Sequence, residues 1–134
     1  MRPRLLSACV AEGIGAFTLV FAGCGAIVID SVSNGQITHV GVGLVFGLVV
    51  AAMIYATGHL SGAHLNPAVT LGFVLAHHFP LRRMAGYWLA QLAGAIAAAP
   101  LPFPLHGWPL IRSWTSAIRA ARVPESASTW CGSS

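Results

Sequence analysis

The organisation of this chain is decided by a polar stretch inside an apolar sequence, Ser61-Gly62-Ala63-His64-Leu65-Asn66-Pro67-Ala68-Val69-Thr70. Proline tolerates the first position of a helix, where its missing N–H has no intrahelical partner to lose, and asparagine is a preferred N-cap. Asn66-Pro67-Ala68 therefore predicts the start of a helix. The apolar run that follows ends near residue 76, which is too short to cross a bilayer of about 30 Å at about 1.5 Å per residue.

The composition around this stretch is that of a membrane protein. Of the 134 residues, 56% are hydrophobic and only 7% are charged, and the mean hydropathy is +0.75. No Asp, Glu, Lys or Arg occurs from residue 31 to residue 81, a run longer than the about 20 apolar residues that one span needs. The sequence predicts an all-α integral membrane protein, and its main partner is the lipid bilayer.

The apolar sequence divides into three predicted spanning helices and one half-helix. The spans are expected at about 7–29, 39–57 and 84–99, and the half-helix at about 66–76. Small residues at Ala90, Gly94 and Ala98, and the pair Gly43 and Gly47, predict faces where helices pack closely. Tyr87 and Trp88 are aromatics suited to the membrane interface.

A change of composition near residue 100 divides the chain into two parts. Prolines recur at alternate positions from Pro100, and each removes a backbone donor and ends a helix. We expect a single repeat at 1–99. Residues 100–134 are expected to form an aberrant tail, disordered or irregular, of out-of-frame or otherwise aberrant origin.

The arginines indicate how the half-helix enters the membrane. Seven arginines and no lysine give the net charge of +4; they flank apolar segments and are too sparse for a nucleic-acid-binding patch. With a cytoplasmic N-terminus, a third full crossing through residues 58–79 would leave Arg82 and Arg83 outside, against the positive-inside rule. A stretch that dips into the membrane and returns keeps both arginines cytoplasmic. The charges therefore favour a re-entrant loop.

The re-entrant loop predicts a hydrogen-bonding track for neutral solutes. A half-helix that begins near the midplane directs the positive end of its dipole there, and the NH₂ group of Asn66 adds a donor. Irregular backbone at membrane depth is tolerated only beside protein or a water-filled cavity, so the carbonyls of residues 62–65 are expected to line a cavity. Such a lining orients a solute with a lone pair and disfavours a cation.

The remaining polar residues give little support to other chemistry. Glu12 lies in the first apolar segment, where an ionisable group marks a structural or functional site that faces the protein interior. His59 and His64 are five positions apart and lack an acidic or cysteine neighbour, so no metal site and no cofactor are expected. No nucleophile with a nearby base appears, which argues against an enzyme.

The extended stretch resembles the first signature of the major intrinsic proteins, the family of aquaporins and glycerol facilitators. The resemblance covers about Ala8 to Ala99 and includes Glu12, Gly23-Cys24-Gly25 and Gly58-His59. It implies half of an aquaporin-like fold, in which two inverted repeats bring two Asn-Pro-Ala ends together in each subunit of a homotetramer. A second Asn-Pro-Ala, and the arginine expected after it, have no counterpart in this sequence.

The resemblance also implies roles for individual residues. Glu12 matches a buried glutamate that braces the pore loop, and Phe46 matches an aromatic of the selectivity constriction. Phenylalanine there is similar to water-selective members, whereas residues 54–64 are similar to the nodulin-like branch, which is linked with metalloids and small neutral solutes. These two features therefore indicate different permeants.

We therefore expect a channel-family protein for passive passage of water or small neutral solutes, located in a bacterial inner membrane. Lacking the second repeat, it is expected to be a truncated subunit that does not conduct alone. Two alternatives remain open at this point. A pair of half-channels could conduct as a dimer, or the chain could be a small membrane-anchored lipoprotein or another non-channel membrane protein, because Phe21-Ala22-Gly23-Cys24 resembles a lipoprotein cleavage box.

Overall fold

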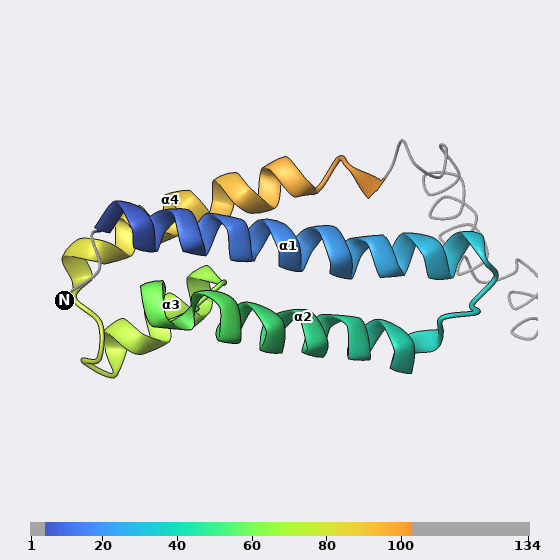
Figure 1. Ribbon diagram of the computed structural model, residues 1–134, viewed down its shortest axis with the longest axis horizontal. Coiled ribbons are helices and arrows are strands. Elements are labelled where there is room, and N and C mark those ends of the chain that lie inside the picture. Colours follow the sequence, from blue (N-terminus) through green and yellow to red (C-terminus); the bar gives the residue numbers. More distant parts are fainter. Residues whose placement is uncertain (1–4, 103–134) are drawn as a thin grey trace, which may run out of the picture.

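The computed structural model describes residues 5–102, which form four α-helices (Figure 1). These are α1 (Leu5–Val32), α2 (Thr38–Ser61), α3 (Pro67–Leu75) and α4 (Leu81–Ala98). The described residues contain no strand, and the prediction of an all-α fold with one short helix is confirmed. Of the predicted tail at 100–134, residues 103–134 lie outside the described range.

The helices run past two of the predicted ends. The first helix continues to Val32, and the carboxylate Oδ1 of Asp30 then accepts hydrogen bonds from the backbone N–H of Ile37 (2.9 Å) and of Thr38 (2.8 Å), which ties the connection to α2. The second helix was expected to end near residue 57 but continues to Ser61.

Gly62 sets the end of α2. It has φ +88°, and its N–H bonds to the carbonyl of Gly58 at 2.9 Å. A left-handed glycine after the last turn is a common helix terminator, whereas the polar residues at 58–61 remain compatible with helical backbone. The irregular loop is therefore shorter than predicted.

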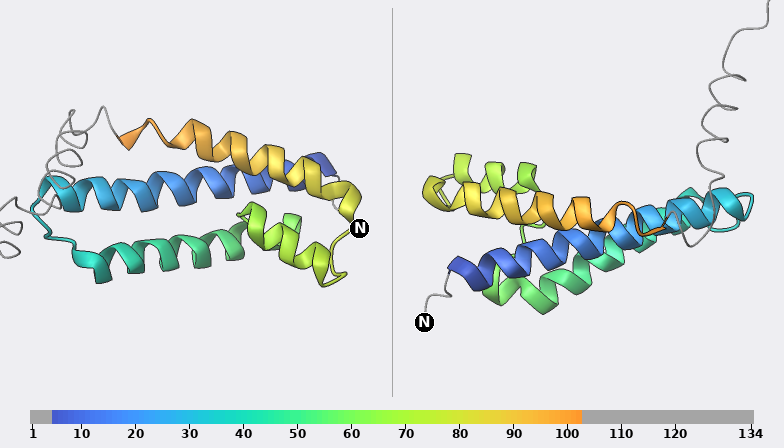
Figure 2. Two further views of the ribbon diagram at one scale, coloured as in Figure 1. Left: turned by 180° about the vertical axis from the view of Figure 1, so that it is seen from behind. Right: turned by 90° about the horizontal axis from the view of Figure 1, so that it is seen from above.

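The half-helix α3 runs toward the end of the molecule at which α1 and α4 begin. Figure 1 shows α1 between α4 and α2, and α3 running toward the end of the molecule at which α1 begins. The views in Figure 2 agree that the N-terminal end of α1 and the start of α4 lie at one end, and that the connection from α1 to α2 lies at the other. This is the arrangement expected of a re-entrant segment.

Two glycines bring α1 and α4 together. A Cβ atom on Gly94 would collide with the backbone carbonyl of Gly13, and one on Gly13 would lie 3.2 Å from the carbonyl oxygen of Ala90. Ala98 of the same face is fully buried. The small-residue face predicted on the third span is confirmed as this contact. By contrast, Cβ atoms on Gly43 and Gly47 would meet nothing within 4 Å among the described residues.

Two of the described helices, α1 and α2, are long and apolar enough to cross a membrane, judged by length and composition. The fourth helix has 18 residues and carries Arg82 and Arg83 in its first turn, and it does not meet the same measure. Large apolar side chains face outward, among them Tyr55, which is 89% exposed. An outer surface of this kind suits lipid or other helices better than water.

Candidate pore-loop site

The loop between α2 and α3, residues 62–66, adopts an unusual backbone. Besides Gly62, two residues with side chains have positive φ, Ala63 at +49° and Leu65 at +56°. Residues other than glycine adopt this region at a cost of order 1–3 kcal/mol each, and they persist there only when surrounding contacts hold them. The contacts that hold this loop therefore define the site.

Glu12 of α1 holds the middle of the loop. Its side chain is 0% exposed. Oε1 accepts a hydrogen bond from the backbone N–H of His64 at 2.9 Å, and Oε2 accepts one from the N–H of Leu65 at 2.7 Å. A buried carboxylate is tolerated only when donors compensate for lost water, and here two successive backbone amides supply that compensation.

The same two bonds orient the carbonyl groups of the loop. In a trans peptide the N–H and the preceding C=O point in opposite directions, and the described residues contain no cis peptide. Because the amides of His64 and Leu65 point toward Glu12, the carbonyls of Ala63 and His64 point away from it. These carbonyls accept no hydrogen bond from residues 5–102, so their lone pairs have no partner among the described residues.

A buried network extends from Glu12 to α4 and α3. The side-chain amide of Gln91 donates to Glu12 Oε2 at 2.7 Å and to Thr70 Oγ1 at 3.1 Å. Gln91 is 1% exposed and Thr70 is 0% exposed. The amide oxygen of Gln91 is buried without a hydrogen-bond partner among the described residues. Glu12 thus receives three hydrogen bonds and anchors three elements of the fold.

Thr70 links this network to the start of α3. Its hydroxyl donates to the carbonyl of Asn66 at 3.2 Å and lies 3.2 Å from Nδ1 of His64. A hydroxyl has one proton, so the ring of His64 donates from Nδ1 in this arrangement. The His64 ring also stacks on Phe73 with centroids 4.6 Å apart and meets Phe79 edge-on at 4.9 Å. The loop residue is thereby fixed by both polar and aromatic contacts.

The half-helix begins as its sequence predicts. Asn66 has an extended backbone, and its side-chain Oδ1 accepts a hydrogen bond from the N–H of Ala68 at 2.8 Å, while Pro67 occupies the first helical position. The N-cap prediction is confirmed. Asn66 is exposed, and no hydrogen bond within residues 5–102 uses its NH₂ group. That group remains available as a donor beside the positive end of the helix dipole.

Two consecutive residues of α4 hold the ends of the loop. The hydroxyl of Tyr87 donates to the carbonyl of Ser61 at 2.8 Å, and Nε1 of Trp88 donates to the carbonyl of Pro67 at 3.1 Å. Both were expected at the membrane interface. Tyr87 is 2% exposed and does not face outward, because its ring packs beside His64 and Phe79.

Two further predicted site residues have side chains that take no part in these hydrogen bonds, Leu65 and Phe46. Leu65 is 5% exposed, and its side chain packs against Gly15 of α1, where a Cβ atom would collide with it. Only its backbone is thus available to a pore. Phe46 is half-buried on α2, with its ring against Gly23 of α1. No hydrogen bond or ring contact described for residues 5–102 joins Phe46 to the loop, and its place in a constriction stays a prediction.

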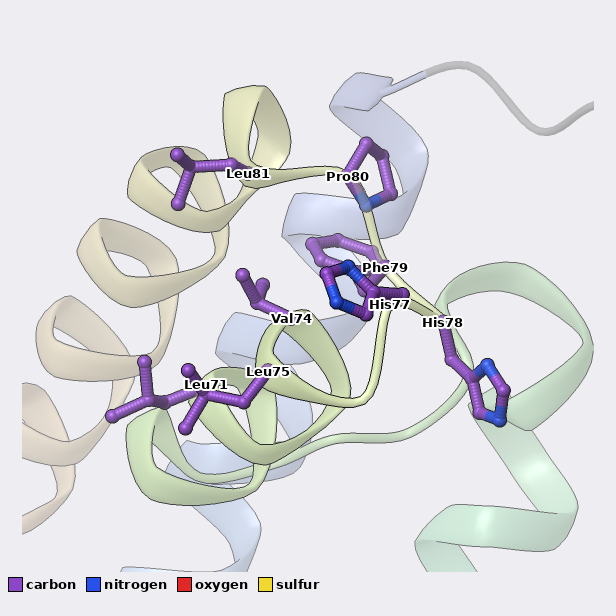
Figure 3. A pocket seen from close by; sticks show the side chains of 8 residues that line it. All are labelled: Leu71, Val74, Leu75, His77, His78, Phe79, Pro80 and Leu81. Atoms are coloured by element: carbon purple, nitrogen blue, oxygen red, sulfur yellow. The ribbon is translucent and has the colours of Figure 1, made fainter.

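An open groove lies between the end of α3 and the start of α4, and it has a volume of about 820 Å³. Figure 3 shows its apolar leucine side chains and His78, which points away from them. It is lined by Leu71, Val74, Leu75, His77, His78, Phe79, Pro80 and Leu81. The groove shares no hydrogen bond with the Glu12 network, and its mainly apolar lining is unlike that of the loop.

Sequence reasoning missed Thr70, Gln91 and the hydrogen bonds of Tyr87 and Trp88. One signal was present, because Gln91 is the lone amide side chain in an apolar segment, and a polar group there faces the protein interior. Its partner, however, is 79 positions away. Pairing the two required the fold.

Comparison with known proteins finds a family and several similar proteins. The family model described as "Major intrinsic protein" matches residues 1–118, beyond residue 99, where the predicted resemblance ends. Aquaporin NIP1-1 of Zea mays is 53% identical over 90 residues, which cover 67% of this chain and 32% of the relative. Aquaporin NIP3-1 of Arabidopsis thaliana is 47% identical over 98 residues, which cover 72% of this chain and 30% of the relative. This chain thus spans about a third of the length of the curated relatives it matches.

Proposed function

Because this chain belongs to the major intrinsic protein family, whose members are membrane channels and not enzymes, we propose that its described residues supply one half of a pore for water or a small neutral solute. The predicted alternative of a non-channel lipoprotein is thereby set aside. The observation that carries the proposal is the pair of bonds from Glu12 to the amides of His64 and Leu65.

The proposed pore wall combines acceptors and a donor in series. The carbonyls of Ala63 and His64 face away from Glu12 and lack partners within residues 5–102, so they can replace the hydrogen bonds that a solute loses on leaving water. The NH₂ group of Asn66 donates at the end of this series. A water or alcohol molecule makes both kinds of bond, whereas a cation meets the positive end of the α3 dipole and is disfavoured. Phe46 is proposed to narrow the same pore.

A single chain is proposed not to conduct. The family's fold needs two half-helices that meet end to end from opposite sides of the membrane, as in other inverted repeats. Two copies of this chain inserted in one orientation would place both half-helices on the same side. A second, inverted half is therefore required, and the tetramer of the family is proposed only for such a complete subunit.

The proposed location is an integral membrane with the N-terminus in the cytoplasm, because Arg82 and Arg83 then lie on the cytoplasmic side. The relatives are plant aquaporins of the NIP group, in agreement with the nodulin-like wording of residues 54–64. They give no support to the bacterial inner membrane that was predicted from the sequence. The aberrant, irregular character of residues 100–134 likewise remains a proposal.

A chimera tests whether this half builds a pore. Residues 8–99 would replace the matching first part of the maize relative, and water flux into proteoliposomes would be followed by stopped-flow light scattering. We expect the chimera to conduct, and the same chimera with Asn66→Asp to conduct several-fold less, because a carboxylate removes the donor and places a negative charge at the pore. A chimera that reaches the membrane in normal amount without conducting would overturn the proposal.

The chain by itself provides the matching control. Proteoliposomes that contain it are expected to take up water no faster than liposomes that contain its Asn66→Asp variant. Water flux clearly above that variant would contradict the requirement for a second half and would revive the paired half-channel.

A further inference from the structure

The loop that carries Asn66 is held at both ends by neighbouring residues of one helix. Tyr87 bonds to Ser61, the last residue of α2, and Trp88 bonds to Pro67, the first residue of α3. The two contacts therefore bracket residues 62–66. No other side chain among the described residues donates to the backbone at these two points.

The two acceptors differ in what they need. The carbonyl of Ser61 belongs to the last turn of α2, where carbonyl groups lack intrahelical donors, so the Tyr87 hydroxyl supplies a missing partner. The carbonyl of Pro67 lies in the first turn of α3, and a carbonyl oxygen has a second lone pair; the indole N–H of Trp88 uses it. Both bonds are thus compatible with the two helices in their present positions.

Adjacent side chains on a helix diverge by about 100°, because a turn contains 3.6 residues. One side chain of α4 therefore reaches the end of α2 while the next reaches the start of α3. The short backbone segment between Tyr87 and Trp88 is rigid, so it fixes how far apart the two loop ends lie. Glu12, which comes from α1, orients the middle of the loop and forms no bond to Ser61 or Pro67.

We propose that Tyr87 and Trp88 form a two-point clamp that sets the separation of Ser61 and Pro67, and through it the depth of Asn66 in the pore. The two are positioning residues that act through backbone carbonyls, and they do not touch the permeant. This role rests on the proposed function, since depth matters only if Asn66 faces a pore. The clamp thus makes the depth of Asn66 depend on two residues outside the Asn-Pro-Ala stretch itself.

The test uses the full chain in lipid nanodiscs and amide hydrogen exchange, which needs no conduction. Tyr87→Phe removes only a hydroxyl, and Trp88→Phe removes the indole N–H. We expect each variant to raise exchange at the amides of residues 62–70 by about five-fold or more, the equivalent of about 1 kcal/mol at RT of about 0.59 kcal/mol. Exchange in the central turns of α1 should stay unchanged.

Trp88→His separates donation from ring packing. In histidine, Nε2 occupies the position in the five-membered ring that Nε1 occupies in tryptophan, so this variant can keep the donor with a smaller ring. We expect it to restore slow exchange at residues 62–70, whereas Trp88→Phe does not. Leu89→Ala, a change at the exposed neighbour of Trp88, is the matched control and should have no effect.

The clamp is overturned if Tyr87→Phe and Trp88→Phe leave exchange at residues 62–70 unchanged, or if Trp88→His raises it as much as Trp88→Phe does. In the conducting chimera, loss of the clamp should also change the ratio of glycerol flux to water flux, because the depth of Asn66 is altered. If the chimera fails to conduct, the proposed function fails, while the exchange result still decides whether the clamp exists.

Discussion

The side-chain amide of Gln91 donates a 2.7 Å hydrogen bond to the carboxylate of Glu12, across 79 positions of sequence. Both side chains are buried, and they join α1 to α4 at the point where the re-entrant loop rests. The carboxylate also accepts hydrogen bonds from two backbone amides of the loop. Glu12 therefore connects the packing of α1 and α4 to the backbone geometry of the loop. The predictions below follow from that connection.

Glu12→Gln is expected to loosen the loop without changing the size of the side chain. The amides of His64 and Leu65 bond to different oxygens of Glu12, and a glutamine replaces one of these oxygens by an NH₂ group, which would face a donor. A lost hydrogen bond to a charged group and an unsatisfied buried donor together predict a loss of roughly 2–4 kcal/mol in unfolding free energy. Thermal unfolding followed by circular dichroism in detergent measures it. A melting temperature equal to that of the unmodified chain would contradict the bracing role.

Thr70→Val tests the polar connection between α3 and α4. Valine keeps the shape but removes the hydroxyl that Gln91 and His64 contact, which leaves buried groups without partners, at an expected cost of about 1–3 kcal/mol. Thr18→Val is the matched control, since the Thr18 hydroxyl bonds only to the carbonyl of Ile14 in its own helix at 2.8 Å. It should change stability by less than about 0.5 kcal/mol. Equal effects of the two variants would refute the network.

Gly94→Ala should separate α1 from α4. The added methyl group would collide with the backbone carbonyl of Gly13, and such overpacking costs about 1–3 kcal/mol. The loop should loosen as well, because Gln91 moves with α4. Gly43→Ala, at a position where a Cβ atom meets nothing within 4 Å of the described residues, should be neutral or stabilising by up to about 1 kcal/mol. Unfolding of both variants under one condition compares them, and a harmless Gly94→Ala would show that the close helix contact is unnecessary.

The sequence was sufficient to predict features that depend on local chemistry. The start of the half-helix at Asn66 and Pro67 was predicted correctly because capping and proline preference act within a few residues. The burial of Glu12 followed from the cost of an exposed charge in lipid. Both predictions rest on the chemistry of the residues themselves, which tertiary contacts do not change.

Features that depend on tertiary contacts could not be predicted in the same way. The end of α2 was placed before Gly58, but the left-handed conformation of Gly62 ends the helix, and composition alone does not distinguish the two glycines. Tyr87 was placed at the membrane interface, since its hydroxyl gives no local sign of its partner 26 positions away. Thr70 likewise has partners in the loop and on α4.

The re-entrant path of the half-helix is tested most directly by the sidedness of two exposed positions, Asn34 and His78. Each would be replaced by cysteine in a chain whose native cysteines Cys9, Cys24 and Cys131 are changed to alanine, and labelled with a membrane-impermeant maleimide in vesicles of known orientation. We expect His78→Cys to react from the side that carries the N-terminus and Asn34→Cys from the opposite side. Reaction of both cysteines from the same side would mean that residues 58–79 cross the membrane completely, and it would contradict the half-pore.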